Sequence, residues 1–186
     1  MSNIGELSYF LGLQIQQQKD NILLSQEKYA RNLVEKFKLN ESTPMETPMP
    51  TTGKLQSNPG ERSVDQKLYR SMIGSLLYLT ATRPDIAFSV GCCAIFQADP
   101  KESHLKAVKR IIRYVNGTVD YGLSYSMDTN NSLVAYSNVD WAGCVEDRKS
   151  TSGGCFYIGQ NLVAWHNKKQ NSQYLSTCET EYIAAG

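Results

Sequence analysis

Four basic side chains between residues 106 and 113 have a spacing that suits contact with a phosphate backbone. If this segment is helical, Lys106, Lys109, Arg110 and Arg113 lie within a stripe about 100° wide. Apolar residues occupy the opposite side of the same helix, namely Leu105, Val108, Ile112 and Val115. A narrow cationic stripe on an anchored helix can contact successive phosphates. The alternative is the solvated polar face of an ordinary amphipathic helix.

A second, weaker basic candidate comes near the end of the chain. Lys168 and Lys169 are adjacent there, beside Gln170. We interpret this pair as a further possible contact to nucleic acid.

Asn138 and Asp140 flank Val139 in a segment with strand character. Side chains two residues apart share a face of a strand and lie nearly 7 Å apart, at ~3.3 Å per residue. Divalent cations such as Mg²⁺ and Ca²⁺ take oxygen ligands at ~2.0 to 2.6 Å, so this separation is large for two ligands of one ion. The alternative is that Asp140 is a solvated carboxylate at the end of a strand.

The bulk composition is that of an ordinary globular chain. Of 186 residues, 41% are hydrophobic and 20% are charged, and the net charge of +1 requires any basic surface to be local. Two histidines and five cysteines without C-x-x-C spacing argue against zinc and against a disulfide framework. No apolar run approaches the ~20 residues of a membrane span. We therefore expect an intracellular protein of the cytoplasm or nucleus, without a membrane partner and with reduced thiols.

The first part of the chain predicts a hairpin, a helix and a connector. Residues 9–15 indicate a strand in which Gly12 permits a bulge or a close backbone approach, and residues 22–24 a returning strand. Ser25 is a possible N-cap for a helix that carries Ala30, Leu33, Val34 and Phe37 on one face. Four prolines between 40 and 60 then indicate an extended connector.

Three helices should follow. Ser63 and Gln66 suggest a capping box for the first, and Pro84 suits the first position of the second. Asp99 as cap, with Pro100 and Glu102, predicts the start of the third, and Gly117 predicts its end. The period then changes to that of strands over 123–125, 133–137, 155–158 and 162–165, and residues 176–185 suggest the first turns of a helix.

Short motifs occur in a fixed order along nearly the whole chain. The earlier ones are Gly5-Glu6-Leu7, Tyr9-Phe10-Leu11-Gly12-Leu13, Gln26-Glu27-Lys28-Tyr29, Thr47-Pro48-Met49, Tyr69-Arg70, Ile73-Gly74-Ser75-Leu76, Tyr78-Leu79-Thr80 and Arg83-Pro84-Asp85-Ile86. The later ones are His104, Lys109-Arg110, Arg113-Tyr114, Gly117-Thr118, Asp140-Trp141-Ala142-Gly143, residues 148–153, Trp165, Lys168-Lys169-Gln170 and Glu179-Thr180-Glu181-Tyr182-Ile183-Ala184. In this order they resemble copia-type retrotransposon Pol polyproteins, where the reverse transcriptase ends and ribonuclease H begins.

The resemblance implies an α+β fold in three parts. Residues 1–60 would hold the end of the reverse transcriptase palm, the first thumb helix and the connector, and residues 61–118 a helical thumb and connection region. Residues 119–186 would form a truncated ribonuclease H-like domain with an incomplete mixed sheet. The Tyr-x-Asp-Asp motif of the polymerase does not occur in this chain, so we do not expect it to polymerise DNA.

The resemblance also implies a carboxylate cluster that holds two Mg²⁺ ions. Its first aspartate would fall at Asn138, which offers only a neutral oxygen, with Asp140 as a weak substitute. Glu181 matches the second carboxylate, whereas Glu179 is better explained by the dipole of the helix start. With one ligand neutral and others absent, we expect Mg²⁺ not to bind tightly.

The function implied is a polyprotein fragment that binds a template–primer duplex or an RNA–DNA hybrid and contacts other polyprotein parts, without complete catalytic machinery. Whether the chain is itself an enzyme stays open. One alternative is a weakly active ribonuclease H fragment that uses Asp140 and Glu181. Another is a non-catalytic nucleic-acid-binding or interaction module.

Overall fold

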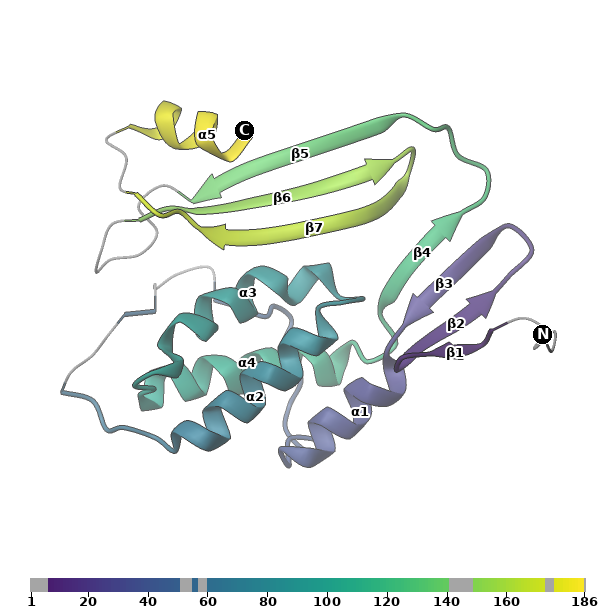
Figure 1. Ribbon diagram of the computed structural model, residues 1–186. Coiled ribbons are helices and arrows are strands. Elements are labelled where there is room, and N and C mark those ends of the chain that lie inside the picture. Colours follow the sequence, from purple (N-terminus) through teal and green to yellow (C-terminus); the bar gives the residue numbers. More distant parts are fainter. Residues whose placement is uncertain (1–6, 51–54, 57–59, 141–148, 173–175, 186) are drawn as a thin grey trace.

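The computed structural model describes residues 7–50, 55–56, 60–140, 149–172 and 176–185. Within these ranges it contains five α-helices and two antiparallel sheets, which confirms the predicted α+β class. Figure 1 shows the second sheet, β5 to β7, above a layer of helices, and the first sheet beside that layer. None of the described helices is long and apolar enough to cross a membrane.

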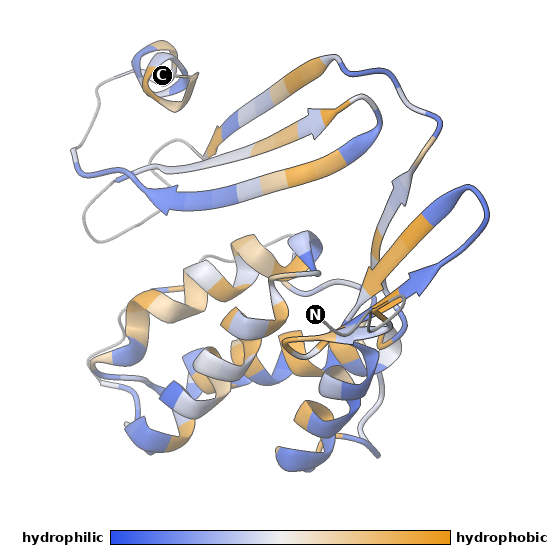
Figure 2. Cartoon of the chain, turned by 45° about the vertical axis from the view of Figure 1, so that its right-hand side comes forward, coloured by the Kyte–Doolittle hydropathy of each residue, from blue (hydrophilic) through white to orange (hydrophobic). Residues whose placement is uncertain are grey.

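The first sheet joins both ends of the helical region. It consists of β1 (Tyr9–Phe10), β2 (Leu13–Gln17), β3 (Asn21–Ser25) and β4 (Gly122–Ser126), in the order β1-β2-β3-β4. In Figure 2 the apolar strand β3 is orange, whereas the polar turn that precedes it is blue. The strand predicted at 123–125, which the resemblance places in the ribonuclease H-like part, is β4 of this first sheet. It pairs with β3 because the chain leaving the helices returns beside that open strand edge.

The segment 9–15 forms two strands rather than the single strand that was predicted. Leu11 and Gly12 adopt positive φ angles of 47° and 80°, which turn the chain between β1 and β2. The hydroxyl of Tyr78 donates a hydrogen bond to the Leu11 carbonyl over 2.6 Å. A Cβ at Gly12 would overlap the same hydroxyl, so the predicted close backbone approach at Gly12 is confirmed.

Four helices enclose the main core. They are α1 (Glu27–Lys36), α2 (Gln66–Leu79), α3 (Pro84–Ala94) and α4 (Glu102–Gly117), with the short 3₁₀ helix η1 (Ile95–Gln97) after α3. Their facing apolar side chains are almost fully buried and include Leu33, Val34, Met72, Ile73, Leu76, Ile86, Val90, Ile111 and Ile112. Burial of such side chains contributes about 1.5 to 3 kcal/mol each.

The helix starts differ in detail from those predicted. Asp65, not Ser63, caps α2, since its carboxylate accepts from the backbone N–H groups of Lys67 and Leu68. At α1 the capping residue is Gln26, one position after Ser25, and its side chain makes no capping bond. Pro84 does occupy the first turn of α3, as predicted.

The predicted N-cap of α4, Asp99, was also two residues too early. Lys101 is the N-cap, and Asp99 instead forms an ion pair with the Lys101 ammonium at 2.7 Å. This contact holds the pKa of the Asp99 carboxyl below its usual range, mainly through the hydrogen bond from Lys101.

The second sheet contains β5 (Leu133–Asp140), β6 (Thr151–Ile158) and β7 (Asn161–Lys169), in that order. We expected a mixed sheet, but the three described strands pair only antiparallel. Parallel neighbours need a crossover of a dozen or more residues, which is longer than either connection here. Helix α5 (Thr177–Ala185) packs mainly on β5, and α3 packs beneath β7. Hydrogen bonds from Trp165 to the Thr80 carbonyl and from Asn167 to the Ala87 carbonyl join the sheet to the helices.

Candidate nucleic-acid interface

The basic stripe lies on the side of α4 that faces away from the core, as the periodicity predicted. Val108, Ile112 and Val115 have no exposed surface. On the other side, Lys106 and Lys109 are exposed. The buried face fixes the rotation of the helix, so the lysine side chains are directed outward from a rigid element.

Both arginines of the stripe hold the connector against α4. Arg110 donates from Nε to the Thr47 carbonyl over 3.1 Å and from Nη2 to the Thr47 hydroxyl over 2.8 Å. Arg113 donates from Nε to the Thr43 carbonyl over 2.7 Å, and its own carbonyl accepts from the Met45 N–H. Residues 43–47 of the predicted extended connector therefore run along the helix. Sequence reasoning missed these contacts because their acceptors are mostly backbone carbonyls, which every residue carries.

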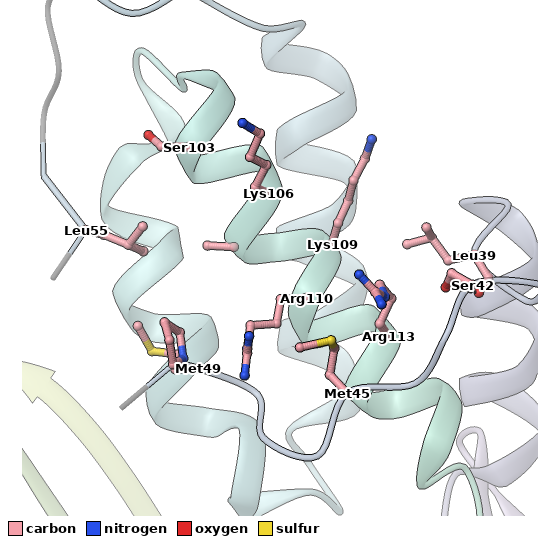
Figure 3. Close-up of a pocket in the computed structure, with 12 residues that line it drawn as sticks. Leu39, Ser42, Met45, Met49, Leu55, Ser103, Lys106, Lys109, Arg110 and Arg113 are labelled. Carbon is pink, nitrogen blue, oxygen red and sulfur yellow. Dashed lines mark hydrogen bonds between the residues drawn. The ribbon is translucent and has the colours of Figure 1, made fainter. Parts of the chain in front are cut away.

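The connector and α4 enclose a hollow of about 610 Å³. Figure 3 shows Leu39, Met45, Met49 and Leu55 around it, together with the basic side chains of α4. In the hydrogen bonds of the described residues, Arg110 uses Nε and Nη2 and Arg113 uses only Nε, so each guanidinium keeps at least one nitrogen for another partner. Four basic side chains of α4 therefore lie around this hollow, and hydrogen bonds to the connector fix the two arginines.

His104 stabilises the start of α4. Its Nδ1 accepts from the Lys101 N–H over 3.1 Å, and its Nε2 lies 2.8 Å from the Gln56 carbonyl. Because the carbonyl can only accept, Nε2 carries the proton in this arrangement. The ring stacks on Phe96 with 3.9 Å between centroids. His104 is thus a packing and hydrogen-bonding residue.

The second basic candidate lies elsewhere. Lys168 and Lys169 end β7 and line a different hollow, of about 560 Å³, together with Gln170 and the last residues of α5. Lys168 is exposed and Lys169 is half-buried. The structure does not bring this pair to the stripe on α4, since the two basic segments line separate hollows.

Two candidates for metal ligation, Asn138 and Glu181, are not brought together either. Asn138 is exposed on β5 and lines a hollow toward α3, whereas residues 183–185 of α5 line the hollow on the other side of the sheet. Glu181 is exposed on α5, and its neighbour Thr180 is the residue of that helix that is buried. Asp140 pairs with Thr151 in the ladder, and its side chain lies outside the described residues.

The positions of these side chains test whether the described residues could hold the two magnesium ions that the resemblance implies. The Asn138 amide oxygen accepts from the Val139 N–H over 2.9 Å, so one of its lone pairs is already in use. Within the described parts of the chain, no three His, Cys, Asp or Glu side chains gather closely enough to hold a metal. The described side chains therefore do not fit a two-metal centre.

The fold and the site define an α+β protein with a cationic helix face beside a bound connector. Comparison with known proteins places this chain among retrotransposon sequences. It is 37% identical over 185 residues to the uncharacterized mitochondrial protein AtMg00810 of Arabidopsis thaliana, covering 99% of this chain and 76% of that protein. It is 39% identical over 177 residues to the retrovirus-related Pol polyprotein from transposon RE1 of Arabidopsis thaliana, covering 95% of this chain. It is 35% identical over its full length to the corresponding polyprotein from transposon TNT 1-94 of Nicotiana tabacum.

The chain belongs to the copia-type retrotransposon Pol polyprotein family. It spans 12% of the length of the RE1 polyprotein and 14% of the TNT 1-94 polyprotein. No protein-family profile matches the chain, and no solved structure does.

Proposed function

We propose that this part of the polyprotein binds the phosphate backbone of a template–primer duplex or an RNA–DNA hybrid through α4, without catalysing a reaction. The cationic stripe of α4 carries the proposal. Lys106 and Lys109 supply exposed charges, and Arg110 and Arg113 supply charges held in place by the connector. Phosphate contacts of this kind set affinity and depend little on base sequence.

The proposal assigns no cleavage step. Asn138 is neutral, and Glu181 stands on a helix whose terminal residues line the opposite side of the sheet. Two-metal phosphodiester cleavage needs several carboxylates around one pair of ions. Binding without catalysis is therefore the function that the described side chains support best.

The test is a titration of a fluorescent RNA–DNA hybrid at several salt concentrations. Each phosphate contact contributes about −0.9 to the slope of log K against log salt for B-form DNA. The variant Lys106→Glu/Lys109→Glu removes two such contacts, so its slope should be smaller by about two and its affinity at low salt at least about tenfold lower.

A matched control keeps the same change in net charge. Lys28 and Lys67 are exposed on α1 and α2, away from the stripe. The variant Lys28→Glu/Lys67→Glu should retain the wild-type slope. If both double variants lose affinity equally, the binding reflects overall charge, and the assignment to α4 is wrong.

A further inference from the structure

A third hollow, of about 420 Å³, lies between the sheet β5-β6-β7 and helix α3. Gly153 of β6 lies on its floor and pairs with Asn138 of β5 on one side and Asn167 of β7 on the other. A Cβ added at Gly153 would meet only the His166 carbonyl oxygen, at 3.8 Å. The floor is therefore bare backbone with open space above it, flanked by two amide side chains.

Aromatic rings surround this floor. Phe88 projects from α3 and is 43% exposed, and Tyr136 on β5 is 62% exposed. Tyr157 packs edge-on against Tyr136 with 5.9 Å between ring centroids. Trp165 is fixed by its indole N–H, which donates to the Thr80 carbonyl over 3.2 Å. Large exposed rings around a preformed hollow are suited to stacking with a flat ligand.

The two amides leave the Asn138 nitrogen as a donor and the Asn167 oxygen as an acceptor for a ligand. Asn138 uses its oxygen to accept from the Val139 N–H, and Asn167 uses its nitrogen to donate to the Ala87 carbonyl. In the part of the chain that the structure describes, the Asn138 nitrogen and the Asn167 oxygen make no hydrogen bond. No Asp, Glu, Lys or Arg side chain of the described residues lines the hollow. Its chemistry thus favours an uncharged ring with polar atoms on its edge.

We propose that this hollow binds a nucleobase that is not base-paired. The ring would lie over Gly153 and stack on Tyr136 or Phe88, with its polar edge toward Asn138 and Asn167. A nucleobase combines a flat π-face with adjacent donors and acceptors, which is the pattern that the two amides complement. This site is separate from the stripe on α4 and does not depend on it. The base can come from a free nucleoside or from a single-stranded nucleic acid.

The first experiment is a nuclear magnetic resonance titration of the ¹⁵N-labelled chain with adenosine, cytidine, guanosine and uridine. The probes are the Trp165 indole N–H and the Asn138 and Asn167 amide signals. At least one nucleoside should shift these signals in a saturable manner. The Gly153→Ala variant places a methyl group on the floor without a clash, so it should fold normally and weaken that binding.

The second experiment measures a single-stranded oligodeoxynucleotide against an abasic oligomer of equal length. Tyr136→Ala should weaken binding of the normal oligomer by about 5- to 150-fold, the loss of one stacked base, and leave the abasic oligomer unaffected. Leu133→Ala is the matched control, because Leu133 is 71% exposed on the same strand and does not line the hollow. If Tyr136→Ala weakens binding of the normal oligomer, the base comes from a single-stranded nucleic acid. If nucleosides shift the probe signals but Tyr136→Ala leaves oligomer binding unchanged, the ligand is a free nucleoside. The inference is overturned if no nucleoside shifts the probes and Tyr136→Ala binds the oligomer as the wild type does.

Failure here is distinguishable from failure of the proposed function. The Lys106→Glu/Lys109→Glu variant should bind nucleosides normally, whereas Tyr136→Ala should bind a fully paired hybrid normally.

Discussion

The guanidinium of Arg83 donates to both the carbonyl and the hydroxyl oxygen of Thr118, each over 2.7 Å, and so joins the start of α3 to the end of α4. Arg83 is only 2% exposed. It also donates to both carboxylate oxygens of Asp85, over 2.9 and 2.8 Å, and lies over the rings of Tyr114 and Tyr121. One buried side chain thereby connects two helices and the turn that leads to β4.

Replacement of Arg83 should therefore destabilise the helical region. Arg83→Ala leaves Thr118 and Asp85 without their partner and opens a cavity, so we expect a loss of about 2 to 4 kcal/mol in the free energy of unfolding. Arg83→Lys keeps the charge but not the fork of donors and should lose about half as much. Urea denaturation followed by circular dichroism measures both. Arg31→Ala is the control, because its ion pair with Glu27 is exposed and should contribute less than about 1 kcal/mol. Equal losses for Arg83→Ala and Arg31→Ala would contradict this account.

The connector should come loose when the two arginines that hold it are removed. Arg110→Ala/Arg113→Ala deletes three of its hydrogen bonds, so limited proteolysis should cut between residues 40 and 60 several times faster than in the wild type. Lys106→Ala/Lys109→Ala removes the same number of charges from the same helix and should not change the rate. A similar acceleration in both variants would mean that the arginines do not retain the connector.

Restoring the missing charge at position 138 should not produce a nuclease. Asn138→Asp supplies the carboxylate that the family resemblance calls for, but Asn138 faces the hollow near α3, away from the one lined by the end of α5. We expect neither the wild type nor this variant to cleave a labelled RNA–DNA hybrid in Mg²⁺, as measured on a denaturing gel. Cleavage by Asn138→Asp that disappears when Glu181→Gln is added would show that the two side chains do cooperate.

Stability should depend on pH through a buried thiol. Burial raises the pKa of Cys93 from about 9 to about 12, with a smaller contribution from Cys92. The folded state thus keeps a proton that the unfolded state releases, so the stabilisation is complete below about pH 9 and is lost as the pH rises toward 12. Relative to Cys93→Ala, the wild type should lose about 1.4 kcal/mol per pH unit between pH 9 and 11 in urea denaturation. Parallel pH profiles for the two proteins would show that the thiol stays uncharged in both states.

The features that the sequence predicted well depend on local periodicity. The apolar and basic sides of α4 follow from helical spacing, and Pro84 indicates a helix start because its ring fixes φ. The features it did not predict depend on contacts between distant residues. Leu11 adopts a positive φ beside a hydrogen bond from Tyr78, which lies 67 positions along the chain.

The candidate site likewise combines residues that local spacing predicted with contacts between distant residues that it did not predict. Residue type and spacing identified Lys106 and Lys109, whose exposure the structure bears out. The anchoring role of Arg110 and Arg113 could not be predicted, because it requires the connector to pass within hydrogen-bonding distance. The hollow over Gly153 depends on strand register, which places Asn138 and Asn167 on either side of it.

The ladder between β3 and β4 matters for where the polypeptide can be divided. Asn21 pairs with Ser126, so this pairing brings together the two ends of the segment that contains all four core helices. A recombinant fragment that stops at residue 118 would lack β4, which pairs with Ile22 to Leu24. Strand β3 would then be an unpaired edge strand that favours aggregation. A fragment of the helical region should therefore extend through Ser126. Because β3 and β4 lie far apart in the sequence, their pairing raises the contact order, which slows folding.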